Sequence, residues 1–348
     1  MTRQKSMRVL QITGLERAEL VEMPVPQPQQ AEVLVKVLAV VTCNQFDLHI
    51  YHGRPMLDPT QPVVFPQPPG FPGHEWVGEV LELGPGATQL QVGDWICVPG
   101  GRPRGTGRHY PGAYAQYRVV DETASIKVPK GIDPLKLAPL EMAACVSASI
   151  LELKAMNAIE GRRAGVSGLG PAGLIAAQML RAEGADQVIG LEVSQPRREH
   201  ALSSGVVDRA IDPRSEEGQA FPVRRGGDLG RDSHGGPIDV AIDCAGARAS
   251  VQYLMDHTKD IVSLFAVQRE PYTFEGWFVG LHQGLKLFGY PGRDPACGEY
   301  AVRRVRNGSI DLSLAVSHTM SLEEYDKALE LMESHRALKV AFFPNETP

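Results

Sequence analysis

A glycine-rich turn constrains the fold of this chain more than any other feature of its sequence. Residues 168–173 read GLGPAG, which matches the pattern G-x-G-x-x-G. The residues before the turn (164–168, AGVSG) are short and apolar, as in a buried strand, and those after it (173–185) carry apolar residues at helical spacing. A strand, a glycine turn and a helix in this order are typical of a parallel, doubly wound α/β sheet.

The alternation of strand and helix patterns continues beyond the turn. Apolar, β-rich runs occupy residues 187–194, 238–246 and 261–267, and a helical pattern lies at 196–205. Residues 213–237 interrupt the alternation with a polar, glycine-rich segment, which predicts an irregular surface insertion. This part of the chain is therefore predicted to form one α/β domain around a parallel sheet.

The N-terminal third of the chain has a different pattern. Residues 8–120 contain short strand-like runs separated by turn residues, which predicts a β-rich barrel or sandwich. Seven prolines within residues 53–73 exclude a helix or an inner strand there. We expect this segment to be a surface loop that leads into His74 and lines a pocket with Trp76 and Tyr110 as walls.

Composition limits the class of protein. A chain of 348 residues is long enough for two domains. Its 35 basic and 41 acidic residues give a formal net charge of −6 without basic runs, so we expect no nucleic-acid partner. We also expect no secretory leader and no membrane partner, because no long apolar window is visible. The cysteines are scattered and odd in number, which is typical of a reduced, cytoplasmic protein; they are residues 43, 97, 145, 244 and 297.

The glycine turn is a candidate nucleotide site. Gly168 permits a tight turn, Gly170 lets the backbone approach a pyrophosphate, and Gly173 lets the helix pack closely on the strand. The amides of the first helical turn can bind phosphate groups. The candidate cofactor-binding residues of this turn are Gly168, Gly170, Pro171, Ala172 and Gly173.

An acidic residue stands where the second strand of this domain ends. Glu192 lies 19 residues after Gly173, at a position from which a carboxylate can accept both hydroxyls of an adenosine ribose. It would repel a 2′-phosphate, so we predict NAD as the cofactor, with NADP as the alternative. Arg197 and Arg198 follow closely and can either serve a phosphate or remain solvated; Arg197 is counted among the candidate cofactor-binding residues.

Three segments carry side chains of the types that bind metals. Cys43, the pair His74 and Glu75, and Glu141 offer a thiolate, an imidazole and carboxylates. A catalytic zinc takes three protein ligands, leaves one position open and polarises an alcohol oxygen, so that hydride can be released to a nicotinamide. Spacing alone does not decide, because a lone cysteine in an apolar run is commonly a core residue and a His–Glu pair is commonly hydrogen-bonded.

Several motifs occur together in one order along the chain. They are GHEWVGEV (73–80), GPG (84–86), VGD (92–94), PGAYAQY (111–117), GLGPAG (168–173) and GLKLFG (284–289). Together, over residues 8–343, they resemble the medium-chain dehydrogenase/reductase superfamily, which includes zinc alcohol and polyol dehydrogenases.

This resemblance implies an α/β protein of two domains. A GroES-like, β-rich catalytic domain would comprise residues 1–155 and 293–348, and a Rossmann domain with a doubly wound parallel sheet would comprise residues 156–292. The resemblance also implies an NAD(P)-dependent alcohol dehydrogenase-like oxidoreductase. Such an enzyme would interconvert a secondary alcohol, polyol or cyclitol and its ketone, and would assemble as a homodimer or homotetramer.

The sequence departs from the zinc enzymes of this superfamily at two places. The lobe of four close cysteines that holds a structural zinc is absent, and residues 99–112 are rich in Gly and Arg instead. At most one zinc, the catalytic one, is therefore expected. The usual Cys-Gly-(Ser/Thr)-Asp-x-His is replaced by CNQFDLH at 43–49, which is one residue longer.

Two registers of this longer segment compete. If Cys43 is a ligand, one residue is inserted, and Gln45 takes the place of the hydroxyl that relays the alcohol proton. If the Asp-x-His portion sets the register, Asn44 replaces the cysteine and Phe46 the hydroxyl, and the segment resembles zinc-free quinone oxidoreductases and enoyl reductases. Neither register keeps the Ser/Thr relay; His49 can accept the proton instead, or be an exposed structural histidine.

An acidic residue at position 141 favours the zinc alternative, because the sorbitol- and secondary-alcohol-type members of the superfamily carry Glu or Asp there. Cys145, one helical turn on, is an alternative ligand. Two other hypotheses stay open: a zinc-free NAD(P)H-dependent reductase of a quinone or activated alkene, and a non-catalytic binding role. The predicted metal ligands are Cys43, His74, Glu75 and Glu141, and the predicted catalytic residues are Cys43, His49, His74 and Glu75.

Overall fold

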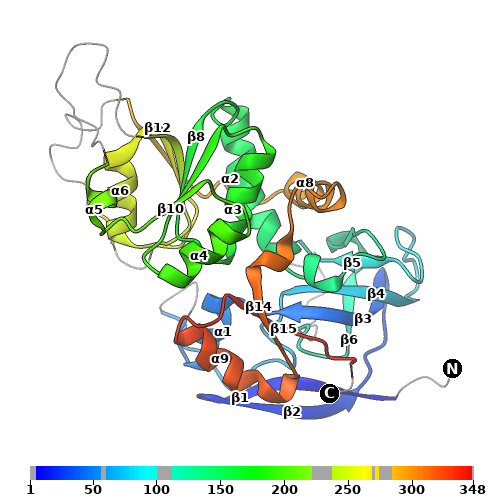
Figure 1. The fold of residues 1–348 in the computed structure, drawn as a ribbon. Helices are drawn as coiled ribbons and strands as arrows, with labels where there is room; N and C mark the ends of the chain where they lie inside the picture. Colours follow the sequence, from blue (N-terminus) through cyan, green and yellow to red (C-terminus); the bar gives the residue numbers. More distant parts are fainter. Residues whose placement is uncertain are drawn as a thin grey trace. The chain divides into compact units, whose positions relative to one another are not determined.

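The chain folds into two compact units (Figure 1). The computed structural model describes residues 5–55, 60–99, 112–221, 237–268, 271–273 and 284–346. The first unit comprises Met1–Ala144, Ala301–Arg306 and Ala315–Pro348, and the second comprises Cys145–Tyr300 and Asn307–Leu314. The C-terminal segment therefore completes the first unit.

The first unit is built on a seven-stranded sheet with mostly antiparallel pairing. The strand order is β14 (Val316–Met320), β15 (Lys339–Phe342), β3 (Glu32–Val41), β4 (Glu75–Leu83), β5 (Trp95–Cys97) and β7 (Ile126–Lys127), and β6 (Tyr117–Asp121) also pairs with β3. The remaining elements are the hairpin β1 (Ser6–Gly14) and β2 (Arg17–Pro24), the helices α1 (Asn44–Tyr51) and α9 (Tyr325–Glu333), and short 3₁₀ turns at Glu122–Ala124, Pro134–Lys136 and Leu322–Glu324. The pairing of Ala341 with Val41 places the C-terminal strand inside the N-terminal sheet.

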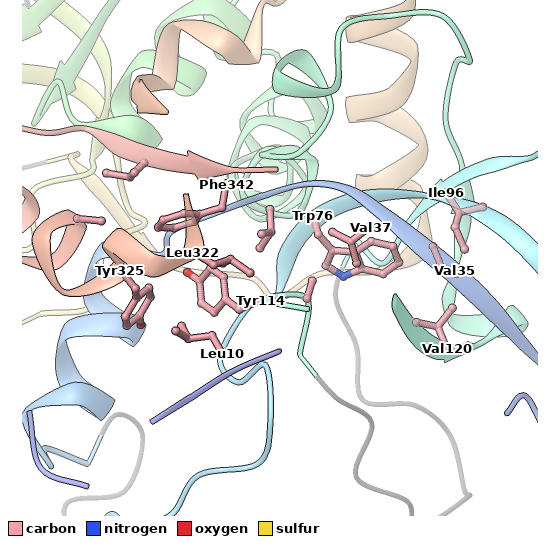
Figure 2. Packing of buried hydrophobic residues seen from close by; sticks show 14 of the residues in the cluster. Leu10, Val35, Val37, Trp76, Ile96, Tyr114, Val120, Leu322, Tyr325 and Phe342 are labelled. Atoms are coloured by element: carbon pink, nitrogen blue, oxygen red, sulfur yellow. The ribbon is translucent and has the colours of Figure 1, made fainter. Parts of the chain in front are cut away.

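The core of the first unit gathers residues from both ends of the chain (Figure 2). The rings of Tyr114, Tyr325 and Phe342 pack against one another with centroids 5.2, 5.7 and 6.1 Å apart. Trp76 is buried, and the guanidinium carbon of Arg118 lies 4.6 Å from its ring centroid. The structure thus places Trp76 in the core and not at a pocket wall, while Tyr110 lies outside the described residues.

The second unit is built on a six-stranded parallel sheet. Its order is β10 (Arg209–Ile211), β9 (Gln187–Leu191), β8 (Arg163–Ser167), β11 (Ile238–Asp243), β12 (Thr258–Leu264) and β13 (Lys286–Gly289). Helices cover both faces of the sheet (Figure 1). The order reverses between β8 and β11, and ligands of such sheets bind at the carboxyl ends of the strands at that reversal. The two sheets confirm the predicted fold class, a GroES-like β-rich domain with a Rossmann domain.

The helices of the central region are bounded as follows: α2 (Leu140–Ala155), α3 (Pro171–Ala182), α4 (Gln195–Ser203), α5 (Glu216–Gln219), α6 (Arg248–His257) and α8 (Pro295–Arg306), with a 3₁₀ turn at Leu312–Ala315. Helix α5 lies within the segment predicted to be irregular. Residues 222–236 of that segment lie outside the described part of the chain.

The boundaries between the two units differ from those of the predicted domains, which lie at residues 155/156 and 292/293. The second unit begins at Cys145, within α2, and Ser147 donates a hydrogen bond to the sulfur of Met179 on α3 at 3.8 Å. The second unit also includes Asn307–Leu314. Gln178 holds that segment, because its side-chain oxygen accepts from the amide of Asp311 at 2.7 Å and its amide group donates to the carbonyl of Asp311 at 3.2 Å.

Contrary to expectation, one helical stretch is long and apolar enough to cross a membrane. It spans Pro134–Ala155, 22 residues with a mean hydropathy of 1.3 in its most apolar window, and 67% of that window is buried inside the protein. This is weak evidence for a membrane span, because the core helix of a soluble protein passes the same test. Among the residues that the structure describes, it is the one stretch of this kind.

Candidate metal centre and nucleotide site

The glycine turn has the geometry that a close approach of helix and strand requires. Gly168 follows β8 with φ +84°, in the left-handed region that favours glycine. A Cβ on Gly173 would lie 1.8 Å from the carbonyl oxygen of Gly168, so no side chain fits where α3 packs on β8. Gly170 is open, because the nearest atom to a Cβ there would be Nη1 of Arg197 at 3.8 Å. Helix α3 begins at Pro171 and leaves its first amides free of intrahelical partners.

Glu192 lies beside this turn, directly after β9. One carboxylate oxygen accepts from the amide of Leu169 at 2.9 Å, and the other accepts from the amide of Ser194 at 2.9 Å. Nη1 of Arg197 lies 3.9 Å from the first oxygen, and its Nε is buried with no hydrogen-bond partner among the described residues. The predicted cofactor-binding residues therefore meet at one place, with Nη1 of Arg197 close to both Gly170 and Glu192.

Three of the four predicted metal ligands also meet. Cys43 stands between β3 and α1, and His74 and Glu75 stand at the start of β4. The pairing of Val41 with Glu75 brings these two segments side by side. One ligand atom each from Cys43, His74 and Glu75 lies within 4.8 Å of the others. Thiolate, imidazole and carboxylate are together a donor set that zinc accepts.

Glu75 is held by a cation from the C-terminal segment. Nζ of Lys339 lies 2.5 Å from Oε1 of Glu75 and donates to the carbonyl of Thr42 at 2.8 Å. Both charged side chains are fully buried. The other oxygen, Oε2, is buried and has no hydrogen-bond partner in the described part of the chain. A buried carboxylate oxygen without a partner is costly, and a metal ion at this cluster would satisfy it.

The protonation of the cluster reflects an excess of negative groups. Burial alone lowers the pKa of His74, but a hydrogen bond and the charge from Cys43, with the charges of Glu141 and Glu75, raise it to about 10. Burial raises the pKa of Glu75, and the charge of Lys339 opposes that rise. In the absence of a metal, a proton on His74 therefore supplies the positive charge that a bound dication would bring.

Glu141 and Cys145, the remaining candidates on α2, stand apart from this group. The Glu141 carboxylate is buried in the first turn of α2, and its charge acts on His74, but it is not among the atoms within 4.8 Å. Cys145 belongs to the second unit, where its sulfur accepts a hydrogen bond from Nη1 of Arg293 at 3.1 Å. The ligand role of Glu141 therefore stays a prediction.

The segment with two competing registers forms a single arrangement. Cys43 joins the metal group, and α1 begins at Asn44. The ring of Phe46 contacts the imidazole of His74, with ring centroids 5.3 Å apart. The place of Cys43 in the metal group favours the register in which Cys43 is the ligand. Nδ1 of His49 lies 3.4 Å from the carbonyl of Pro55, outside the group, so its relay role stays a prediction.

A buried carboxylate fixes the backbone of Cys43. Asp47 is fully buried, and its Oδ2 accepts from the amide of Cys43 at 2.7 Å. Its Oδ1 accepts from the phenols of both Tyr114 and Tyr325 at 2.7 Å. Sequence reasoning missed these tyrosines and Lys339. The one signal in the sequence was a lysine embedded in the apolar run LKVAFF.

Comparison with known proteins identifies the family. Residues 29–130 match the family model described as alcohol dehydrogenase GroES-like domain, and residues 171–267 match the one described as zinc-binding dehydrogenase. The L-threonine 3-dehydrogenase of Thermococcus kodakarensis is 31% identical over an alignment that covers 94% of this chain and 95% of that protein. The chain belongs to the zinc-type medium-chain dehydrogenase/reductase superfamily. This dehydrogenase is therefore an oxidoreductase.

Other similar proteins are also named as dehydrogenases. The sorbitol dehydrogenase of Halalkalibacterium halodurans is 28% identical to this dehydrogenase, over 93% of this chain and 94% of that protein. The crystal structure of 2R,3R-butanediol dehydrogenase from Bacillus subtilis superposes with a TM-score of 0.79 at 20% identity, over 97% of this chain and 100% of that one. The structural likeness confirms the fold.

Proposed function

We propose that this dehydrogenase interconverts a secondary alcohol or polyol and its ketone, with NAD as hydride carrier and one catalytic zinc. The observation that carries the proposal is the convergence of Cys43, His74 and Glu75 within 4.8 Å, with one buried Glu75 oxygen left unpartnered. The names of its relatives, which refer to threonine, sorbitol and butanediol, support a small hydroxylated substrate.

The residues of the chain divide the work at the metal centre. A zinc ion, when bound, supplies Lewis-acid polarisation of the substrate oxygen. Cys43, His74 and Glu75 would hold it, with Glu141 as a nearby negative charge or further ligand. Lys339 occupies Oε1 of Glu75, so that Oε2 is the oxygen free to bind. Hydrogen bonds of this kind to the groups around a metal orient its ligands and tune their affinity.

The nucleotide site favours NAD. The bare backbone at Gly170 admits a pyrophosphate, and the free amides at the start of α3 can bind its oxygens. Glu192 presents a carboxylate to the adenosine ribose beside them. Its negative charge would repel a 2′-phosphate, which makes NADP the weaker ligand.

The test combines metal analysis with substitution of the ligands. We expect about one zinc per chain, and we expect Cys43→Ala and His74→Ala each to lose both zinc and alcohol dehydrogenase activity. Cys297→Ala is the matched control, because Cys297 is a buried thiol of the second unit outside the metal group, and it should keep both. Full activity in metal-free protein would overturn the zinc proposal and favour the zinc-free reductase.

We also propose that the protein works in the cytoplasm as a homodimer or homotetramer. None of the five cysteines forms a disulfide in the described structure, which suits a reducing compartment. Light scattering on the purified protein measures the assembly directly. A monomer at micromolar concentration would contradict that part of the proposal.

A further inference from the structure

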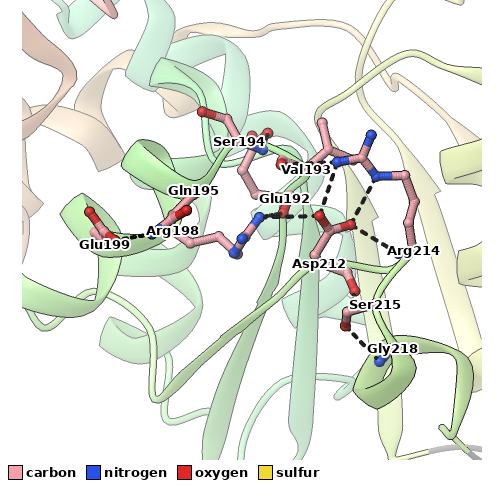
Figure 3. A network of polar contacts seen from close by, with 10 residues as sticks. All are labelled: Glu192, Val193, Ser194, Gln195, Arg198, Glu199, Asp212, Arg214, Ser215 and Gly218. Carbon is pink, nitrogen blue, oxygen red and sulfur yellow. Dashed lines mark hydrogen bonds and ion pairs between the residues drawn. The ribbon is translucent and has the colours of Figure 1, made fainter.

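Charged side chains crowd the place where the adenosine ribose would bind (Figure 3). The parallel pairing of Ile211 with Leu191, and a hydrogen bond from the amide of Glu192 to the carbonyl of Ile211 at 3.0 Å, bring the ends of β10 and β9 together. Asp212 therefore follows β10 beside Glu192, which follows β9. Sequence analysis singled out Glu192 and the arginines after it but assigned no role to Asp212.

Asp212 binds two arginines at once. Its Oδ1 accepts from Nε of Arg214 and its Oδ2 from Nη2 of Arg214, both at 3.0 Å, and Oδ1 also accepts from the amide of Arg214 at 2.9 Å. Nη1 of Arg198 forms an ion pair with Oδ2 at 3.5 Å. A guanidinium in a bidentate ion pair directs its N–H donors at one carboxylate and has few donors left for another anion.

The same arginines also hold the backbone that carries Glu192. Nη1 of Arg198 donates to the carbonyl of Glu192 at 2.7 Å, and Nη2 of Arg214 donates to the carbonyl of Val193 at 3.2 Å. With Arg197, three guanidiniums stand against the two carboxylates of Glu192 and Asp212. The cluster therefore carries a net positive charge, and its guanidinium groups are paired with the two carboxylates.

We propose that Asp212 is a second specificity-determining residue for the nucleotide, acting with Glu192. By occupying Arg198 and Arg214, it withholds from a 2′-phosphate the guanidiniums that would otherwise bind it. Selection of NAD then has two parts, repulsion of the phosphate by Glu192 and sequestration of its natural partners by Asp212. The inference rests on the proposed function, because it takes a nicotinamide dinucleotide as the ligand.

The experiment measures direct binding of NADH and NADPH, by calorimetry, to the full-length protein and its variants. Asp212→Asn removes the charge and keeps the size of the side chain, and Asp212→Ser is a second variant that removes the carboxylate group entirely. We expect each to bind NADPH at least about tenfold more tightly than the wild type, with the NADH affinity changed less than about threefold. In Asp212→Asn/Arg214→Met, most of the gain should disappear.

The matched control is Asp208→Asn. Asp208 precedes β10 at the other end of the strand and pairs with Arg181 at 3.0 Å, away from Glu192. We expect it to leave both affinities unchanged.

An unchanged ratio of NADPH affinity to NADH affinity in folded Asp212 variants would overturn the inference and leave the proposed function standing. A wild type that binds both nucleotides equally well would have the same consequence. A wild type that binds neither would overturn the proposed function itself, and the inference with it.

Discussion

The two candidate sites of this dehydrogenase are built in opposite ways. The metal centre consists of ionisable side chains from separate segments. Cys43 and His74 are partly buried, and the fully buried Glu75 is supported by Lys339. The nucleotide turn consists of backbone from one short run, residues 168–173, in which side chains are missing where contact is closest. The metal centre therefore depends on the pairing of its buried charges, whereas the nucleotide turn depends on the absence of side chains at its glycines.

Removing the cation of the metal centre should have the largest effect. Lys339→Met leaves the fully buried Glu75 without its ion-pair partner, and breaking a buried pair in this way costs about 3–5 kcal/mol. Urea unfolding of the metal-free protein at pH 7 measures the loss. Lys327→Met is the matched control, because it breaks an exposed pair with Glu324 and should cost about 1 kcal/mol or less.

A double variant separates charge from packing at the same place. Glu75→Gln combined with Lys339→Met removes both buried charges, so it should be more stable than Lys339→Met alone. If Lys339→Met unfolds at the same urea concentration as the wild type, the metal centre does not depend on charge pairing, and the contrast between the two sites fails.

Filling the empty space of the nucleotide turn should have the next largest effect. A Cβ from Gly173→Ala would meet the Gly168 carbonyl oxygen at 1.8 Å, so backbone must move, at a cost of about 3 kcal/mol. NADH binding should weaken more than about tenfold, because the turn that faces the pyrophosphate shifts. Calorimetric titration with NADH and urea unfolding check the two effects.

Gly289→Ala is the control for that substitution. Gly289 ends β13, and a Cβ there would meet nothing within 4 Å, so its stability and NADH affinity should match the wild type. An equal loss in both glycine variants would show that the steric contact with the Gly168 carbonyl does not set the cost at Gly173.

Loosening the support of Cys43 should have a smaller effect. Tyr325→Phe removes one of two phenol hydrogen bonds to the buried Asp47, and a hydrogen bond to a charged group is worth about 2 kcal/mol. Because Asp47 holds the backbone of Cys43, zinc affinity in a chelator competition should fall about tenfold. Tyr51→Phe is the control. The hydroxyl of Tyr51 donates to the carbonyl of Glu16 at the surface, so its loss should leave zinc affinity unchanged. Loss of stability without loss of zinc affinity would make Tyr325 a purely structural residue.

The same contrast explains what the sequence could predict. The nucleotide turn was predictable because its parts are local: a strand, a glycine pattern and a helix follow one another, and Glu192 comes one strand later. The ligand types of the metal centre were also visible at Cys43, His74 and Glu75. Their partners were not, because Lys339 and Glu75 are 264 residues apart. Which side chains a returning C-terminal strand brings to a site depends on tertiary pairing, and no periodicity encodes it.

The smallest effect is expected at Asp212, whose charge network is partly exposed, in contrast to the buried pair of Lys339 and Glu75. The hydrogen bonds from Arg214 hold the pKa of Asp212 below its ordinary value of 3.8. A lowered pKa means that the ionised form is favoured in the folded protein, so its contribution is complete above pH 3.8 and is lost as the pH falls through the lowered pKa. At pH 7, Asp212→Asn should therefore cost about 1 kcal/mol or less, and the difference from the wild type should shrink towards zero as the pH falls through the lowered pKa. Urea unfolding of both proteins from pH 7 to pH 2.5 gives the two curves. A difference that persists at the acid end, where Asp212 is uncharged, would show that the stability loss comes from the shape of the side chain and not from its charge.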